Sequence, residues 1–295
     1  MAGGKSESLN FKLVAILIFL LIVLSAVHLS TNFVDWEVFK LFRLPRLLSL
    51  IVAASSVAIS TTILQIMTTP VADSYAFGAP AGALLLFALT HSKFALFLGG
   101  VVFITLVVWI AHKFSLSPMQ TLVFGMVVSS VLYSVTSIWC ILTGQHSILA
   151  GIYFTNPEKL SLVELALPVG VLLISIASLL IFSRDLALLA FKRMGLSFLS
   201  TRKITFIFLA ISGILAANSL YTIGSAMFIG LVVANYALSR FKPQVAPYIA
   251  ALVAANLMLA SDIVCIKFHI EITSLLSIIS GGWFIWLMLT KLRYM

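Results

Sequence analysis

The chain has 295 residues, of which 62% are hydrophobic and only 9% are charged. A soluble domain carries about 25% charged residues, so this composition excludes an ordinary soluble protein and indicates a membrane protein. The formal net charge is +9, but the basic residues lie at the ends of apolar segments and form no basic stripe with interleaved aromatic residues. We therefore expect no nucleic-acid partner.

Ten apolar runs follow one another along the sequence, and a helix that spans a bilayer needs about 20 such residues. The runs cover residues 11–30, 44–67, 77–92, 94–111, 119–143, 163–183, 204–222, 223–241, 244–264 and 272–292. We predict an all-α, polytopic membrane protein in which residues 1–295 form a single domain of about ten transmembrane helices with short loops. The first run lacks a small-residue cleavage site, so we expect a retained helix. The segment 144–161 is expected to form a short interfacial helix.

Lysine and arginine residues predict the orientation of these helices, since cytoplasmic loops carry an excess of both. If the N-terminus is cytoplasmic and every run crosses, twelve of the 18 basic residues lie inside and six lie outside. Both termini are then cytoplasmic. Segment 183–203 carries five of the inner charges, and segment 40–46 carries three of the six outer ones. A cluster of positive charge on the outer side calls for a specific reason.

The second run, 44–67, is unusually rich in small residues between 53 and 62. Small residues let neighbouring helices approach closely, so we predict that protein rather than lipid surrounds this helix. Gln65 lies near its inner end and must find a hydrogen-bond partner there, because an unpaired amide in hydrocarbon is costly.

Arg43-Leu44-Pro45-Arg46 opens the second run. Pro45 suits the first turn of a helix, where its missing N–H costs nothing. The two arginines have two interpretations that the residues alone leave open. They either extend from a helix end to the interface, or they bind the carboxylates of an acidic partner.

Other polar residues predict little specific chemistry. Asp262 lies near the outer end of the ninth run, where an acid is a functional candidate, although a polar cap or an ion pair is an equally good interpretation. Gly4-Lys5-Ser6 is only the tail of a P-loop pattern, so we expect no nucleotide site in this chain. Cys140 and Cys265 belong to no C-x-x-C motif. No metal spacing joins the histidines, which are His28, His91, His112, His146 and His269.

Five motifs occur in the same order as in one family of transporters. They lie at 43–46 (RLPR), 64–83 (LQ, TPVADS and GAPAGA), 183–190 (SRDLALLA), 224–233 (GSAMFIGLVV) and 261–287 (SDIV, a glutamate and GGWFIWL). This pattern resembles the FecCD-type permeases, the membrane subunits of ABC importers for iron–siderophores, haem and cobalamin. The similarity covers roughly residues 40–293. It implies a transport subunit of a bacterial inner membrane, not an enzyme.

The resemblance also implies a role for several residues. Arg43 and Arg46 match arginines that meet glutamates on the two lobes of an extracytoplasmic substrate-binding protein. The family's third basic docking position falls on Cys265-Ile266 here, and Lys267 is the nearest substitute. The segment 184–203 matches the loop that contacts a cytoplasmic ABC ATPase dimer. Its candidate coupling residues are Arg184, Asp185, Lys192, Arg193, Met194, Gly195 and Leu196.

The sequence departs from the family pattern at several places. Thr69-Pro70-Val71-Ala72 replaces N-P-L-A, Ala234-Asn235 replaces P-H, and the coupling loop is shorter than usual. We expect that this chain pairs with a second, more typical homologous permease in a heterodimer, with a homodimer as the alternative.

The resemblance leaves the cargo open among three kinds of chelate. A ferric siderophore is the first expectation, and haem or cobalamin is the alternative. ATP and Mg²⁺ would bind the partner ATPase, and no cofactor would bind this chain. A secondary transporter and a permease for free metal ions are the rival functions. Both usually carry acids or histidines at mid-membrane depth, and few of the nine acids here lie deep in the apolar runs.

Overall fold

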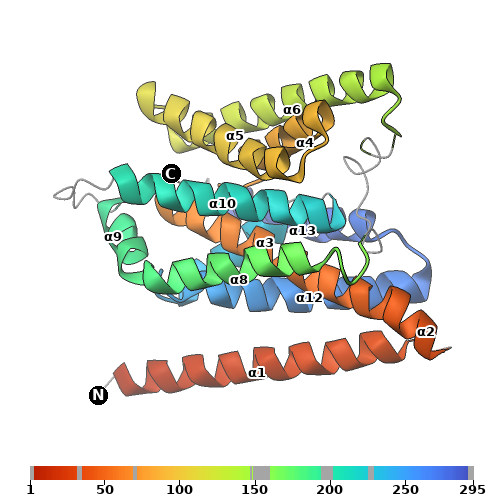
Figure 1. The fold of residues 1–295 in the computed structure, drawn as a ribbon. Helices are drawn as coiled ribbons and strands as arrows, with labels where there is room; N and C mark the ends of the chain where they lie inside the picture. Colours follow the sequence, from red (N-terminus) through yellow and green to blue (C-terminus); the bar gives the residue numbers. More distant parts are fainter. Residues whose placement is uncertain are drawn as a thin grey trace.

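A computed structural model describes residues 3–31, 35–68, 72–146, 148, 160–193, 202–224 and 229–291. Within these ranges the chain forms helices and no β-strand, which confirms the predicted all-α class (Figure 1). The helices are α1 (Gly3–Ser30), α2 (Trp36–Val38), the π-helical turn η1 (Phe39–Arg43), α3 (Leu44–Met67), α4 (Ala79–Thr90), α5 (Lys93–Lys113), α6 (Pro118–Thr143), α8 (Ala166–Ile181), α9 (Ser183–Arg193), α10 (Arg202–Ile223), α11 (Ile229–Arg240), α12 (Ala246–Phe268) and α13 (Ile272–Lys291).

Each of the ten predicted runs contains one of these helices, but the helices differ in length. In the described part of the chain, six are long and apolar enough to span a bilayer, and α8 with α9 adds a seventh if that bent pair is one span. The helices α4 and α11 have 12 residues each, which is about 18 Å at 1.5 Å per residue. They are therefore too short to cross the roughly 30 Å hydrocarbon core.

Two glycines with positive φ explain why these two helices are short. Gly78 has φ +79° directly before α4, and Gly224 has φ +87° directly after α10. Glycine adopts this left-handed conformation without the steric cost of a Cβ. The backbone therefore leaves the helical conformation at both glycines, so that α4 begins only at Ala79 and α10 ends at Ile223, before α11.

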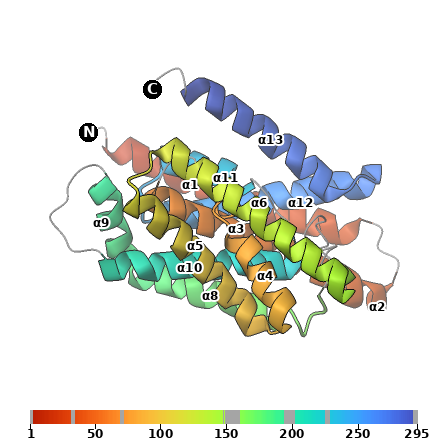
Figure 2. The same ribbon diagram turned by 90° about the horizontal axis from the view of Figure 1, so that it is seen from above.

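The two ends of the molecule carry different elements. The start of α1, the end of α13 and all of α9 lie at one end, which we call the α9 end (Figures 1 and 2). The short helix α2 and the start of α3 lie at the other end, which we call the α2 end. Since α1 starts and α13 ends at the same end of the molecule, the structure agrees with an even number of membrane crossings. The segment predicted as an interfacial helix, 144–161, lies mostly outside the described residues.

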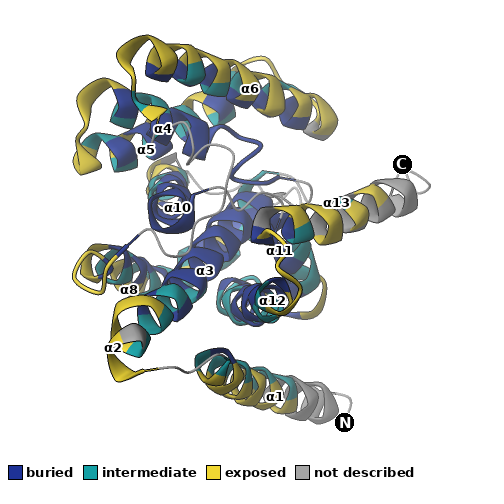
Figure 3. Cartoon of the chain, turned by 90° about the vertical axis from the view of Figure 1, so that its right-hand side faces the viewer, coloured by how far each residue is buried: buried dark blue, intermediate teal, exposed yellow. Residues whose placement is uncertain are grey.

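The helix α3 runs through the centre of the bundle (Figure 3). It packs against α10, α11 and α12. In its most apolar stretch of 18 residues, 89% of the residues are buried inside the bundle. This confirms that its small residues face protein. By contrast, only 6% of the residues in the most apolar 18-residue stretch of α1 are buried. Exposed apolar side chains also cover much of α6. The periphery thus suits contact with lipid or with neighbouring subunits.

Glycines bring the backbones of three helices into direct contact. A Cβ on Gly99 of α5 would lie 2.4 Å from the carbonyl oxygen of Gly82 on α4. A Cβ on Gly100 would lie 2.4 Å from the carbonyl oxygen of Gly213 on α10. Without a hydrophobic driving force between helices in lipid, such close approach supplies the van der Waals contact that holds them together.

Candidate functional site

At the α2 end, three helices bring charged side chains together. Arg46 of α3 donates two hydrogen bonds to Asp262 of α12, from Nε to Oδ2 at 2.9 Å and from Nη2 to Oδ1 at 2.7 Å. His28 of α1 lies on the same carboxylate, with Nε2 2.7 Å from Oδ2. A carboxylate only accepts hydrogen bonds, so Nε2 carries the proton. Asp262 is thus an ion-pair residue in this structure, and Arg46 is its partner.

The burial of these side chains changes sharply over a short distance. His28 and Asp262 are fully buried, whereas 17% of the Arg46 side chain is exposed. The buried charge of Asp262 is therefore compensated by a cation whose side chain is partly exposed. A carboxylate buried without such a partner would carry a desolvation penalty of several kcal/mol.

The other two predicted docking residues lie at the same end. Arg43 is half-buried at the end of η1, one turn before Arg46. Lys267 is exposed near the end of α12, and its Nζ lies 5.9 Å from the ring centroid of Phe268. The three predicted docking cations therefore cluster at one end of the bundle. His28 could not be grouped with them from the sequence, because its partner Asp262 lies 234 positions away.

At the opposite end, α9 follows α8 after a bend of 70°. Leu186 and Leu189 of α9 are buried in an apolar cluster with side chains of α3, α8 and α10, while Arg184 is exposed and Asp185 is half-buried. The helix is therefore amphipathic, with one face fixed to the bundle. Lys192 and Arg193 belong to α9, but their side chains are not described. Met194, Gly195 and Leu196 lie outside the described residues.

A buried polar cluster holds the turn between α3 and α4. Gln65 donates from Nε2 to the carbonyl oxygen of Ala72 at 3.1 Å, which gives the predicted core amide a backbone partner. Thr61 donates from Oγ1 to Oδ1 of Asp73 at 3.0 Å. Both Thr61 and Asp73 are fully buried. These side chains satisfy polar groups of irregular backbone, which is tolerated at membrane depth only when protein surrounds it.

The same turn is tied to two further elements. Tyr75 donates from Oη to the carbonyl oxygen of Gly224, at 3.1 Å, where α10 ends. Ser129 of α6 donates from Oγ to the carbonyl oxygens of Tyr75 and Ala76 at 3.0 and 3.1 Å. Sequence reasoning missed Thr61, Asp73 and Tyr75 as core polar residues. Of these three residues, Asp73 could have been found from the sequence, since an acid between two apolar runs needs a partner.

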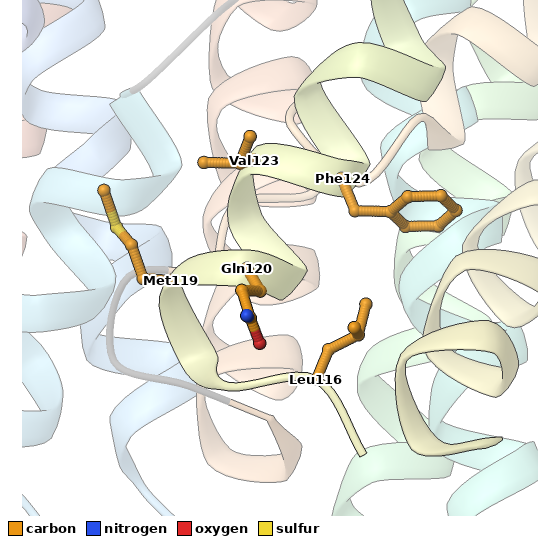
Figure 4. A pocket seen from close by; sticks show the side chains of 5 residues that line it. All are labelled: Leu116, Met119, Gln120, Val123 and Phe124. Carbon is orange, nitrogen blue, oxygen red and sulfur yellow. The ribbon is translucent and has the colours of Figure 1, made fainter. Parts of the chain in front are cut away.

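A shallow, mostly apolar pocket of about 390 Å³ lies at the start of α6 (Figure 4). Its lining residues are Leu116, Met119, Gln120, Val123 and Phe124. Gln120, the polar one, closes a capping box, because its Oε1 accepts from the N–H of Ser117 at 2.8 Å and its own N–H donates to Ser117 Oγ at 3.3 Å. The pocket therefore suits an apolar neighbour more than a polar cargo. Among the described residues, no group of three or more His, Cys, Asp and Glu is placed to hold a metal ion.

Comparisons with known proteins agree with this architecture. The chain is similar to an inward-facing metal-chelate-type ABC transporter, with 22% identity over 94% of this chain and 98% of that one, and a TM-score of 0.75. It is also similar to PsaBC from Streptococcus pneumoniae in complex with a Fab, with 13% identity over 83% of this chain and 90% of that one, and a TM-score of 0.63. At these identities the likeness shows the fold.

Among curated proteins, the comparison gives no significant match. The model of the FecCD transport family, by contrast, matches residues 9–290. Because this match spans nearly the whole chain, and the fold is that of ABC transporter permeases, the protein belongs to the FecCD transport family as a multi-pass membrane permease.

Proposed function

We propose that this chain is the transmembrane permease subunit of an ATP-driven ABC importer for ferric siderophores in a bacterial inner membrane. The observation that carries the proposal is that a group of cations and an amphipathic helix lie at opposite ends of one bundle. Arg43, Arg46 and Lys267 lie at the α2 end, and the helix α9 lies at the opposite end. An importer needs two contact surfaces, one for the protein that delivers the cargo and one for the motor.

The α2 end is the proposed contact for an extracytoplasmic substrate-binding protein. Arg43, Arg46 and Lys267 supply its positive charge. Arginine binds carboxylates in a fixed, two-point geometry, so these residues suit glutamates on the two lobes of the partner. This assignment places the α2 end outside and both termini inside.

The α9 end is the proposed contact for a cytoplasmic ABC ATPase dimer. Arg184, Asp185, Lys192 and Arg193 lie on α9, and the segment 194–203 continues from it. ATP and Mg²⁺ would bind the ATPase, and this chain would contribute the coupling helix but no cofactor or metal ligand. Its role in the importer is therefore transport and not catalysis.

A ferric siderophore is the proposed cargo, with haem or cobalamin as the alternative. Support comes from the similar structure described as a metal-chelate-type transporter. The second permease of the assembly is proposed to be a homologous but different chain, because this one departs from the family pattern at 69–72, at 234–235 and in the coupling loop.

The first experiment is purification of this chain from its native membrane in mild detergent, with mass spectrometry of the proteins that accompany it. We expect an ATPase, a second permease and a substrate-binding protein. The bound ligand of that binding protein would identify the cargo. Recovery with the ATPase but without a second permease would replace the heterodimer by a homodimer. Recovery without any ATPase, combined with proton- or sodium-dependent uptake in vesicles, would refute the importer proposal.

A further inference from the structure

The guanidinium of Arg46 is held in one orientation before any partner arrives. Its Nε and Nη2 both donate to Asp262, at 2.9 and 2.7 Å. Two parallel hydrogen bonds fix the plane of the guanidinium as well as its position. Since 17% of the side chain is exposed, part of this ordered side chain is accessible at the α2 end.

Asp262 is itself immobilised from the other side. It is fully buried, and the fully buried His28 donates to its Oδ2 at 2.7 Å. The three side chains come from α1, α3 and α12, so the arrangement depends on the packing of three separate helices. His28 thus links α1 to α12, as does the hydrogen bond from Asn256 Nδ2 to the carbonyl oxygen of Leu17 at 3.1 Å.

We propose that Asp262 and His28 are positioning residues for docking, which hold Arg46 in the orientation that meets a carboxylate of the substrate-binding protein. This inference rests on the proposed function. A long side chain that is mobile in the free protein must be immobilised on association, and this lowers affinity. The ion pair orders Arg46 beforehand, so the partner meets a preorganised group.

The negative charge of Asp262 also opposes docking, because it partly neutralises Arg46. Salt screens this effect little, because Asp262 is buried and in direct contact with Arg46. Arg43 and Lys267 at the same end keep the surface positive. We therefore expect orientation to dominate the affinity of the assembled complex.

The test uses the full permease complex in nanodiscs and, as the probe, the purified binding protein recovered with it. The readouts are the binding-protein concentration that gives half-maximal ATPase stimulation and the maximal rate. We expect Asp262→Asn and His28→Leu to raise the half-maximal concentration about tenfold, which corresponds to a coupling within the usual range for contacting residues. The maximal rate should not change. His28→Gln, which keeps an N–H donor, should restore most of the affinity.

A double-mutant cycle separates positioning from general stability. In an Arg46→Ala background, Asp262→Asn should raise the half-maximal concentration no further, because the residue that it orients is gone. Full additivity, or a fall in maximal rate at unchanged half-maximal concentration, would make the role merely structural and overturn the inference. A lower half-maximal concentration in Asp262→Asn would make Asp262 a competitor for Arg46 and would also overturn it.

The variant Arg46→Ala distinguishes a failure of this inference from a failure of the proposed function. If Arg46→Ala leaves the half-maximal concentration unchanged, the docking role of Arg46 fails, and the inference fails with it. If Arg46→Ala raises it but Asp262→Asn does not, only the inference fails. A measurement without the partner accompanies both. Phenylglyoxal should modify Arg46 faster in Asp262→Asn than in the unaltered chain, with Arg43 as the internal reference, and equal rates would refute the positioning.

Discussion

Gly100 of α5 and Gly213 of α10 touch through their backbones, each at the point where the other has no side chain. A Cβ on Gly100 would lie 2.4 Å from the carbonyl oxygen of Gly213, and a Cβ on Gly213 would lie 2.7 Å from that of Gly100. Neither carbonyl can move aside as a flexible side chain would. The short distance between α5 and α10 therefore depends on both positions being glycine, which carries a hydrogen atom in place of a side chain.

This contact predicts that one methyl group at either glycine destabilises the protein. Gly100→Ala and Gly213→Ala should each cost about 1–3 kcal/mol, because the two helices must separate. Thermal unfolding in detergent, followed by fluorescence-detected size exclusion, measures the loss. Gly170→Ala on α8 is the matched control, since nothing lies within 4 Å of its Cβ position, and better helix propensity should leave it neutral or slightly stabilised. Equal effects at all three glycines would contradict the backbone contact.

The hydrogen bond from Tyr75 to Gly224 predicts a cost for removing one hydroxyl. Tyr75→Phe leaves the Gly224 carbonyl without this donor and should lose about 1 kcal/mol of stability. Tyr248→Phe is the control, because its buried Oη has no hydrogen-bond partner among the described residues, and it should be neutral or stabilising. The same unfolding measurement applies. A larger loss at Tyr248 than at Tyr75 would show that the bond contributes nothing.

Charge reversal at the α2 end predicts loss of transport without loss of folding. If the proposed docking holds, the double variant Arg43→Glu, Lys267→Glu should abolish uptake of the proposed cargo while the amount of chain in the membrane stays normal, because like charges would then face the glutamates of the partner and the buried pair of Arg46 and Asp262 is left intact. Lys40→Glu is the control, since Lys40 is an exposed cation of the same segment that lies over the Trp36 ring at 5.2 Å. Undiminished uptake in the double variant would exclude docking at these two cations.

Charge reversal at the end of α9 predicts a weaker contact with the ATPase. Lys192→Glu with Arg193→Glu should reduce the ATPase that co-purifies with the chain at moderate salt. Lys113→Glu supplies a comparison at the end of α5, where its Nζ lies 5.1 Å from the ring centroid of Trp109. The ratio of the two proteins on a stained gel is sufficient as a readout. An unchanged ratio in the α9 variant, or an equal drop in the Lys113 variant, would count against a specific contact at α9.

Several features of the fold could be predicted from the sequence because they depend on local composition. Ten apolar runs predicted ten helices, and the small residues of 53–62 predicted that α3 lies inside the bundle. The lengths of α4 and α11 could not be predicted in this way. Apolar residues form both helices and buried turns, so hydropathy alone does not show where Gly78 and Gly224 turn the chain.

The candidate site was less accessible from the sequence, because it is built from distant pairs. Arg46 and Asp262 were each recognisable as a charge that needed a partner. Nothing in a single sequence shows that they are partners of each other across 216 positions. His28 lay in an apolar run, and no sequence pattern connects it with Asp262. Their contact therefore became visible only in three dimensions.

The bend between α8 and α9 has a mechanical consequence. Because α9 packs against α3, and α3 packs against α10, a sideways push on α9 cannot be absorbed by α9 alone and displaces α10 through α3. The carbonyl contact at Gly213 passes the displacement to α5, and that at Gly99 passes it to α4. Close-packed backbones have little compressibility. A load applied at the α9 end therefore passes through the closely packed helices α3, α10, α5 and α4 to the turn at Gly78.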